Sequence, residues 1–180
     1  MIRRIVVTLA VGLACCAAGE GPAMIPARDV MVSYRTEQGG QVLDQRLRWS
    51  AAAHRLRVDA PTPGMFVLVD YATRRMQIVR EKDRTYVEMA APPTLPGLGA
   101  PAGGRYEKSG TDRILGLECT EWALVGSAQG AGVCVTDDGV VLRVQMNGRP
   151  VATAMSVGFT PQEASLFAVP PGFTRVEPPR

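Results

Sequence analysis

Residues 65–79 read MFVLVDYATRRMQIV, and this segment indicates the fold class more clearly than any other part of the chain. Its first part, residues 65–71, is apolar on both alternating sides, as expected of a central strand that is covered on both faces of a sheet. A short polar stretch follows, and residues 76–79 then have the length of a second strand. The segment therefore predicts the middle of a β-sheet.

Strand-like patterns continue outward in both directions, and no stretch has sustained helical periodicity. Further strand segments in the first half are 30–34, 43–49, 56–58 and 86–89. In the second half, the DG and NG dipeptides at 138–139 and 147–148 are those that type I′ hairpins prefer, because both central residues need positive φ. The segment TPQE at 160–163 has the pattern of a capping box and predicts one short turn of helix. Together these patterns predict a mainly β domain with little helix.

The composition is that of an ordinary globular protein, with 180 residues of which 46% are apolar and 21% charged. This length suits a single domain, which we place at residues 24–180. The formal net charge is +3, but Arg3 and Arg4 contribute to it from an N-terminal segment that we expect to be removed. The remaining chain is close to neutral, which argues against a nucleic-acid partner.

Residues 90–104 (AAPPTLPGLGAPAGG) are rich in proline and glycine and predict a long loop.

The N-terminus has the features of a secretory signal peptide, which we place at residues 1–23. Arg3 and Arg4 precede an apolar stretch at 5–14, and small residues follow it. That stretch is too short to cross a bilayer, which takes roughly 20 residues, and no later apolar run is longer, so we expect no transmembrane helix in the mature chain. The paired arginines weakly resemble a twin-arginine signal, but a general secretory signal fits better. Cys15 and Cys16 raise the alternative of a lipoprotein, although neither matches a lipobox cleanly. We therefore expect a periplasmic protein.

Removal of the signal peptide leaves Cys119 and Cys134, which we expect to form a disulfide in an oxidising compartment. The pair Gly126-Ser127 suits a type II′ turn. A hairpin centred on this pair places the two cysteines directly opposite each other on adjacent strands, within bridging distance. Gly130 and Gly132 leave open a wider loop and hence another register.

Sequence motifs of enzymes and metal sites are not found. The one histidine, His54, lies at a tight turn beside three alanines, where a solvated histidine is the usual case. The cysteine spacing fits neither a CxxC redox pair nor a zinc site. No nucleophile elbow, HExxH motif, P-loop or dinucleotide fingerprint occurs in the sequence. We therefore expect a non-enzymatic protein that needs no metal and no cofactor.

One group of charges falls on the polar face of two consecutive strands and consists of Arg46, Arg48, Arg55 and Arg57. A tight turn between these strands would set arginine directly opposite arginine, and like charges so opposed destabilise a sheet. One interpretation is an anion-facing patch, for instance toward lipid headgroups. The other, which we favour, is a solvated outer face in which a two-residue register shift brings Asp44 or Asp59 alongside.

Four segments in a characteristic order carry a family resemblance. They are ARDVMVSYR at 27–35, MFVLVDYATRRMQIV at 65–79, the hairpin GLECTEWAL at 116–124 with VCVTDDGVVLRV at 133–144, and SLFAVPPGF at 165–173. Their layout resembles the LolA-like superfamily of periplasmic lipoprotein and lipid carriers, and within it an uncharacterised exported bacterial family. The resemblance implies a strongly curved antiparallel sheet, a half-barrel whose concave side holds acyl chains. Unlike those carriers, this sequence contains no long amphipathic helix.

A groove for an apolar ligand is the candidate site. A sheet whose central strand is apolar on both faces must cover both faces or expose an apolar patch. The candidate ligand-binding side chains are Phe66, Leu68, Trp122 and Leu124. They are large, they alternate along their strands, and the sequence offers no amphipathic helix to bury them. The opposite interpretation makes them the core and turns outward Met65, Val67, Val69 and Leu117.

These observations predict an exported periplasmic protein that binds lipid, an acyl chain or another apolar ligand in the concave face of a curved sheet. The alternative is a structural or interaction module of the cell envelope that docks a protein partner and holds no small ligand.

Overall fold

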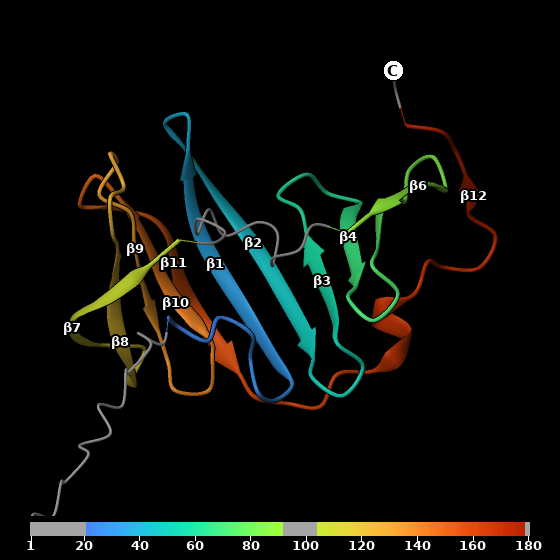
Figure 1. The fold of residues 1–180 in the computed structure, drawn as a ribbon. Helices are drawn as coiled ribbons and strands as arrows, with labels where there is room; N and C mark the ends of the chain where they lie inside the picture. Colours follow the sequence, from blue (N-terminus) through green and yellow to red (C-terminus); the bar gives the residue numbers. More distant parts are fainter. Residues whose placement is uncertain (1–20, 92–103, 179–180) are drawn as a thin grey trace, which may run out of the picture.

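The computed structural model of the chain describes residues 21–91 and 104–178. These residues form one open twelve-stranded sheet with the strand order β12-β6-β5-β4-β3-β2-β1-β11-β10-β9-β8-β7 (Figure 1). Neighbouring strands are antiparallel throughout, except that β12 runs parallel to β6. The predicted fold class, a mainly β protein with a curved open sheet and little helix, is confirmed.

The sheet consists of two meanders in which strands that follow one another in sequence are also neighbours in space. The first meander contains β1 (Val30–Gln38), β2 (Gln41–Ser50), β3 (Arg55–Asp59), β4 (Met65–Asp70), β5 (Arg75–Arg80) and β6 (Thr85–Ala90). The second contains β7 (Tyr106–Ile114), β8 (Leu117–Leu124), β9 (Gly132–Val135), β10 (Val141–Met146) and β11 (Arg149–Gly158). A 3-10 helix, η1 (Ala164–Phe167), and the short β12 (Thr174–Arg175) follow. β1 and β11 lie side by side at the centre and join the two meanders (Figure 1).

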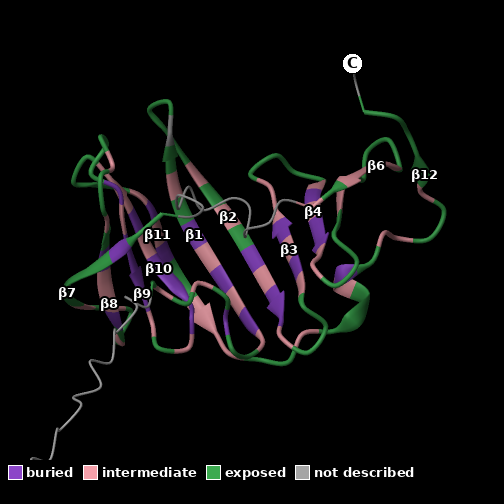
Figure 2. Ribbon diagram, viewed as in Figure 1, coloured by how far each residue is buried: buried purple, intermediate pink, exposed green. Residues whose placement is uncertain are grey.

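Side chains alternate between two faces of the sheet, and Figure 2 shows this as bands of burial along β1 and β2. We call one face the inner face; it carries Val32, Leu47, Val58 and Val67, which oppose one another in neighbouring strands. The main hydrophobic core lies against this face and combines buried residues from both meanders. The opposite face is the outer face.

Two segments far apart in sequence close the inner face. The indole Nε1 of Trp49 donates a hydrogen bond to the carbonyl oxygen of Pro26 over 2.9 Å, and the amide of Ala27 donates to the carbonyl of Asp138 over 2.8 Å. A Cβ at Gly139 would lie 2.3 Å from the carbonyl oxygen of Ile25, so this close approach requires glycine. The segment at 24–27 and the β9–β10 turn are therefore held against each other and over the core.

The two predicted type I′ turns have different outcomes. Asn147 and Gly148 have φ values of 54° and 70°, so the predicted turn is confirmed there. At the DG pair only Gly139 has a positive φ, of 85°, and the type I′ prediction is wrong. The hydroxyl of Thr136 accepts the amide of Val140 over 3.0 Å and thereby closes a longer loop between β9 and β10.

The predicted disulfide between Cys119 and Cys134 is confirmed, with a Cα–Cα distance of 5.4 Å. The predicted direct opposition of the two cysteines is wrong, because Glu121 is the residue opposite Cys134. The β8–β9 connection runs from 125 to 131 and is wider than a two-residue turn, which is the alternative that Gly130 and Gly132 left open. The cysteines are diagonal neighbours on the same face and still lie within bridging distance.

The register shift expected for the arginine group is confirmed, but the solvated outer face is wrong, because the side chains of Arg48 and Arg57 are only 15% and 18% exposed. Asp59 lies opposite Arg46, and Arg48 lies opposite Arg57. The carboxylate of Asp59 forms ion pairs with both Arg48 and Arg57, the latter over 2.7 Å. One acidic side chain therefore compensates the like charges that face each other across β2 and β3.

The predicted short turn of helix is present as η1, but the capping box is wrong, since η1 begins only after Glu163 and has no side-chain cap. The amide of Gln162 donates to a carboxylate oxygen of Asp29 over 2.8 Å, and its side chain donates to the carbonyl of Thr160. These bonds hold the segment before η1 against the start of β1, and the helix begins only after this segment.

Residues 1–20 and 92–103 are outside the described part, and with them nearly all of the predicted signal peptide and most of the predicted loop. Within the described ranges, no helix is long and apolar enough to cross a membrane.

Candidate functional site

The structure does not bring the four candidate ligand-binding residues together. Phe66 and Leu68 lie on the outer face of β4, whereas the strand registers place Trp122 and Leu124 on the inner face of β8. Phe66 and Leu68 belong to a small cluster, and Trp122 belongs to the main core. Two separate surfaces, rather than one groove, therefore have to be considered.

The inner face between the two meanders is filled by the chain itself. A gap of about 20 Å³ remains beside Trp49, Tyr34 and Val141. The phenol of Tyr34 bridges across this gap and donates to the carbonyl of Val141 over 2.7 Å. Its complete burial raises the pKa of Tyr34, so the phenol stays protonated and keeps this bond. This part of the inner face has no room for an acyl chain.

The outer face has a smaller apolar cluster under a thin cover. Phe66, Leu68 and Val79 are buried there beneath the C-terminal segment, which contributes Val169 and Phe173. The guanidinium of Arg57 lies 3.7 Å from the centroid of the Phe66 ring and donates to the carbonyl of Leu166 over 3.2 Å. Arg57 thus fixes the cover to the sheet through both its charge and its planar face.

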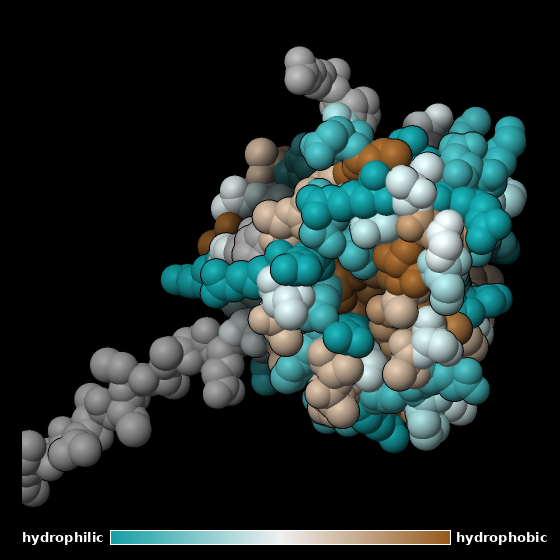
Figure 3. Space-filling model, turned by 90° about the vertical axis from the view of Figure 1, so that its right-hand side faces the viewer, coloured by the Kyte–Doolittle hydropathy of each residue, from teal (hydrophilic) through white to brown (hydrophobic). Residues whose placement is uncertain are grey.

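Next to this cluster the outer face has an open hollow, which we call the C-terminal recess. Its volume is about 400 Å³. The lining side chains are those of Arg55, Leu68, Asp70, Arg75, Gln77, Tyr86, Phe167 and Val169, together with Val69, Thr73 and Ala168. Figure 3, which looks onto the side of the molecule that carries β6 and the C-terminal segment, shows apolar atoms in a hollow framed by hydrophilic ones.

The charged side of the recess is a row of three side chains across three strands. Arg55 lies opposite Asp70, and Asp70 lies opposite Arg75. Asp70 accepts hydrogen bonds from Arg55 over 3.0 Å and from the amide of Thr73 over 2.9 Å. Its partial burial alone would raise the pKa of Asp70, but these two donors outweigh that effect and lower it. Within the described ranges the guanidinium of Arg75 forms no ion pair, so the recess carries an excess positive charge.

A second, smaller hollow lies over β8 and β9. It measures about 190 Å³, and Trp122, Leu124, Gly132 and Gln145 are among its lining residues. Gly132 has no side chain to fill it, and a Cβ there would lie 3.0 Å from the carbonyl oxygen of Trp122. This hollow is below the usual size of a small-molecule site, which is roughly 300–1,000 Å³.

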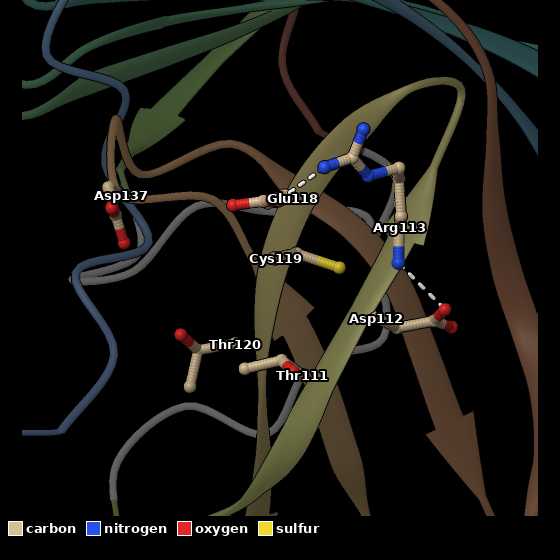
Figure 4. A pocket seen from close by; sticks show the side chains of 7 residues that line it. All are labelled: Thr111, Asp112, Arg113, Glu118, Cys119, Thr120 and Asp137. Atoms are coloured by element: carbon tan, nitrogen blue, oxygen red, sulfur yellow. Dashed lines mark hydrogen bonds and ion pairs between the residues drawn. The ribbon is translucent and has the colours of Figure 1, made fainter.

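A third hollow, of about 580 Å³, is polar and lies at the end of the β7–β8 hairpin (Figure 4). Arg113 and Glu118 form an ion pair across the hairpin, and Asp137 approaches from the β9–β10 turn. Hydrogen bonds from the Arg113 amide and from Arg143 lower the pKa of Asp112. None of its described lining residues is a histidine or a lysine, and its cysteine is held in the disulfide.

Sequence reasoning found one residue of the C-terminal recess, Leu68, and missed the others. The sequence places Arg55 only in the arginine group and Phe167 only in the segment SLFAVPPGF that carries the family resemblance. A signal was present, because Phe167, Val169 and Phe173 are large apolar residues in a segment too rich in proline to form a core strand or helix. Such apolar side chains are expected to pack against the surface of another element.

No protein-family model matches the sequence, and no curated protein matches it either. Similar solved structures include an uncharacterized conserved protein from Thermus thermophilus, with a TM-score of 0.62 and 13% identity over 84% of this chain and 91% of that chain. PNGF-II has a TM-score of 0.57 and 15% identity, over 84% of this chain and 32% of that chain. A Pseudomonas aeruginosa MucA/MucB complex has a TM-score of 0.50 and 16% identity, over 78% of this chain and 55% of that chain. At such identities the likeness shows the fold alone. None of these names identifies the LolA-like superfamily, so that resemblance stays a prediction.

Proposed function

We propose that this protein is a non-enzymatic binding module of the cell envelope that recognises a protein partner on the outer face of its sheet. The observation that carries the proposal is the filled inner face, where about 20 Å³ remains beside Trp49 and Tyr34. An interior acyl site needs a cavity more than ten times larger, on the order of 300 Å³. Binding at the surface is then the function that the geometry supports best.

The disulfide supports an extracytoplasmic location. Cys119 and Cys134 are almost fully buried and sit on neighbouring strands. Paired structural cysteines are rare in reducing compartments and common in exported proteins. The predicted signal peptide at residues 1–23 agrees with this location and is part of the proposal.

Partner binding also has support from the fold comparison. One solved structure that shares this fold is a complex of MucA and MucB. A related sheet is therefore compatible with an assembly of two different proteins.

Native mass spectrometry of protein purified gently from the periplasm tests the proposal first. We expect the mass of the mature chain with one disulfide and no acyl adduct.

Site-specific photo-crosslinking in cells is the second test, with the crosslinker at Arg46 or Gln77 on the outer face and at Arg80 on the inner side of β5. We expect one discrete adduct from the outer positions and none from position 80. A bound acyl species together with no adduct at any position would contradict the proposal.

An apolar ligand is the second candidate function, since two of the candidate ligand-binding residues, Trp122 and Leu124, line one hollow; at about 190 Å³ it can hold only part of such a ligand. Displacement of a fluorescent fatty acid tests this candidate. If Trp122 binds ligand, Trp122→Ala abolishes displacement with little loss of stability. If Trp122 is core, as its burial suggests, the same variant loses about 3–5 kcal/mol of stability.

A further inference from the structure

The outer face of β3–β6 has three parallel rows of side chains that run across the strands. The first row is Arg55, Asp70 and Arg75; the second is Arg57, Leu68, Gln77 and Glu88; the third is Asp59, Phe66, Val79 and Tyr86. The side chains differ in polarity from row to row: those of the first row are charged, those of the second are mixed, and those of the third are largely apolar.

The C-terminal segment covers only part of these rows. Val169 and Phe173 pack against the cluster of Phe66, Leu68 and Val79, which belongs to the second and third rows. The segment is held at its far end by β12, where the amide of Thr174 donates to the carbonyl of Arg84 over 2.9 Å. The first row stays uncovered, and the C-terminal recess is the space between this row and the segment at 167–169.

The recess therefore has one apolar side and one basic side. Leu68 and Phe167 line the hollow but are almost fully buried, so the half-buried Val169 and Tyr86 offer most of its accessible apolar surface. On the opposite side, Asp70 is already satisfied by Arg55 and Thr73, so the guanidinium of Arg75 keeps its donors for a ligand. Arginine forms paired hydrogen bonds with carboxylates, which makes an acidic group the matching ligand.

We infer that the C-terminal recess binds an extended segment of the partner protein in which a leucine-like apolar side chain stands next to an acidic residue. This inference rests on the proposed function and names the chemistry of the partner. The apolar side chain packs on Val169 and Tyr86, and the carboxylate pairs with Arg75.

The lining of the recess favours a peptide over a free amphiphile. The recess is an open hollow with charged residues along one whole side, whereas a long acyl chain needs apolar surface on most sides. A fatty acid is the competing occupant, and the experiment includes it.

NMR titration of the intact mature protein tests the inference with three probes. They are the acetylated and amidated peptide Leu-Glu-Leu-Asp-Leu, its counterpart Leu-Lys-Leu-Lys-Leu, and dodecanoate. We expect the acidic peptide to shift the amide signals of Gln77 and Ala168, which line the recess. The lysine peptide and dodecanoate should leave these signals in place.

Charge reversal supplies the decisive variant. Arg75→Glu should weaken binding of the acidic peptide by about tenfold and create binding of the lysine peptide, since like charges repel at an interface and opposite charges attract. Arg75→Glu places a carboxylate opposite Asp70, so we expect a small loss of melting temperature, and Arg75→Gln, which removes the charge without this repulsion, should weaken the acidic peptide at an unchanged melting temperature. Arg80→Glu is the matched control, because Arg80 is exposed on the same strand but points to the other face. It should leave both peptides unaffected.

Several outcomes overturn the inference. They are shifts with dodecanoate but not with the acidic peptide, equal binding of the acidic peptide by Arg75→Glu and wild type, or no shift with any probe.

The photo-crosslinking experiment separates this failure from failure of the proposed function. An adduct at Arg46 that persists in Arg75→Glu, without one at Gln77, refutes the recess and leaves the partner-binding proposal standing. Absence of adducts at every position refutes partner binding itself.

Discussion

The inner and outer faces of the sheet are stabilised to very different degrees. On the inner face, side chains from both meanders form one large buried cluster that the segment at 24–27 and the β9–β10 turn close. On the outer face, Phe66, Leu68 and Val79 form a cluster that one short C-terminal segment covers. The cover beside Trp49 and Tyr34 on the inner face leaves a gap of about 20 Å³, and the partial cover of the outer face leaves a recess of about 400 Å³. In this molecule, space for a ligand is found where the cover is incomplete.

Truncation of one leucine on each face measures this difference directly. Leu56 is fully buried on the inner face, and Leu68 is buried on the outer face of the next strand. Leu→Ala substitutions in cores cost about 2–5 kcal/mol, depending on how far the site can collapse. We expect Leu56→Ala to lie near the upper end and Leu68→Ala near the lower end, because the C-terminal segment can move onto the smaller side chain. Urea unfolding of both variants checks this, and equal losses would show that the outer cover is as firm as the core.

Loss of the disulfide should destabilise the second meander by about 3 kcal/mol. The bond closes a loop with a sequence separation of 15, and a loop of this size constrains the unfolded chain by about that amount. The measurement is the urea midpoint of the Cys119→Ser, Cys134→Ser double variant against the oxidised wild type. Hydrogen exchange should accelerate in β8 and β9 more than in β3 and β4. Uniform acceleration over the sheet would mean that the bond stabilises both meanders equally.

The compensating carboxylate on the outer face has a smaller effect. Asp59 pairs with Arg48 and Arg57, and all three side chains are mostly buried. We expect Asp59→Asn to cost about 1–2 kcal/mol, since it leaves two half-buried guanidinium groups without their anion. Asp44→Asn is the control, because the Asp44–Arg35 pair is exposed and such pairs contribute less than about 1 kcal/mol. A loss from Asp44→Asn as large as that from Asp59→Asn would contradict this ranking.

The smallest expected effect is the pH dependence at the edge of the recess. The pKa of Asp70 is lowered below its usual 3.8, chiefly by the amide of Thr73 and by Arg55 acting against the effect of burial. A lowered folded-state pKa stabilises the fold above the unfolded pKa, and this contribution disappears as the pH falls through the folded value. Wild type should therefore exceed Asp70→Asn by less than about 1 kcal/mol above pH ~4, because solvent reaches the carboxylate and screens its charge. Thermal melts from pH 7 to pH 2 should show this difference vanish at the acidic end; a constant difference would exclude titration of Asp70 as its cause.

Local signals in the sequence were sufficient for the strands, for the Asn147-Gly148 turn and for the identity of the disulfide partners. They were insufficient for register where a connection was wider than its turn signal, as between Cys119 and Cys134. They also could not relate the faces of distant strands. The alternation of side chains shows which residues of β8 share a face. It does not show which of these two faces lies on the same side of the sheet as Leu68. Irregularities such as the register shift between Ser33 and Tyr34 change that relation from strand to strand. The cover from the C-terminal segment depends on such long-range contacts, so most of the recess was not predictable.

The pairing of β1 with β11, which joins the two meanders and which we call the seam, has a consequence for folding. Each meander contains only hairpins between consecutive strands, which form in microseconds. The seam pairs Val32 with Val157 across most of the chain length, and such non-local pairing slows two-state folding toward milliseconds to seconds. Until it closes, β1 and β11 each expose a long unpaired edge. A second molecule in the same state presents the complementary edge, so at high concentration refolding should yield dimers in which the two meanders are exchanged between copies.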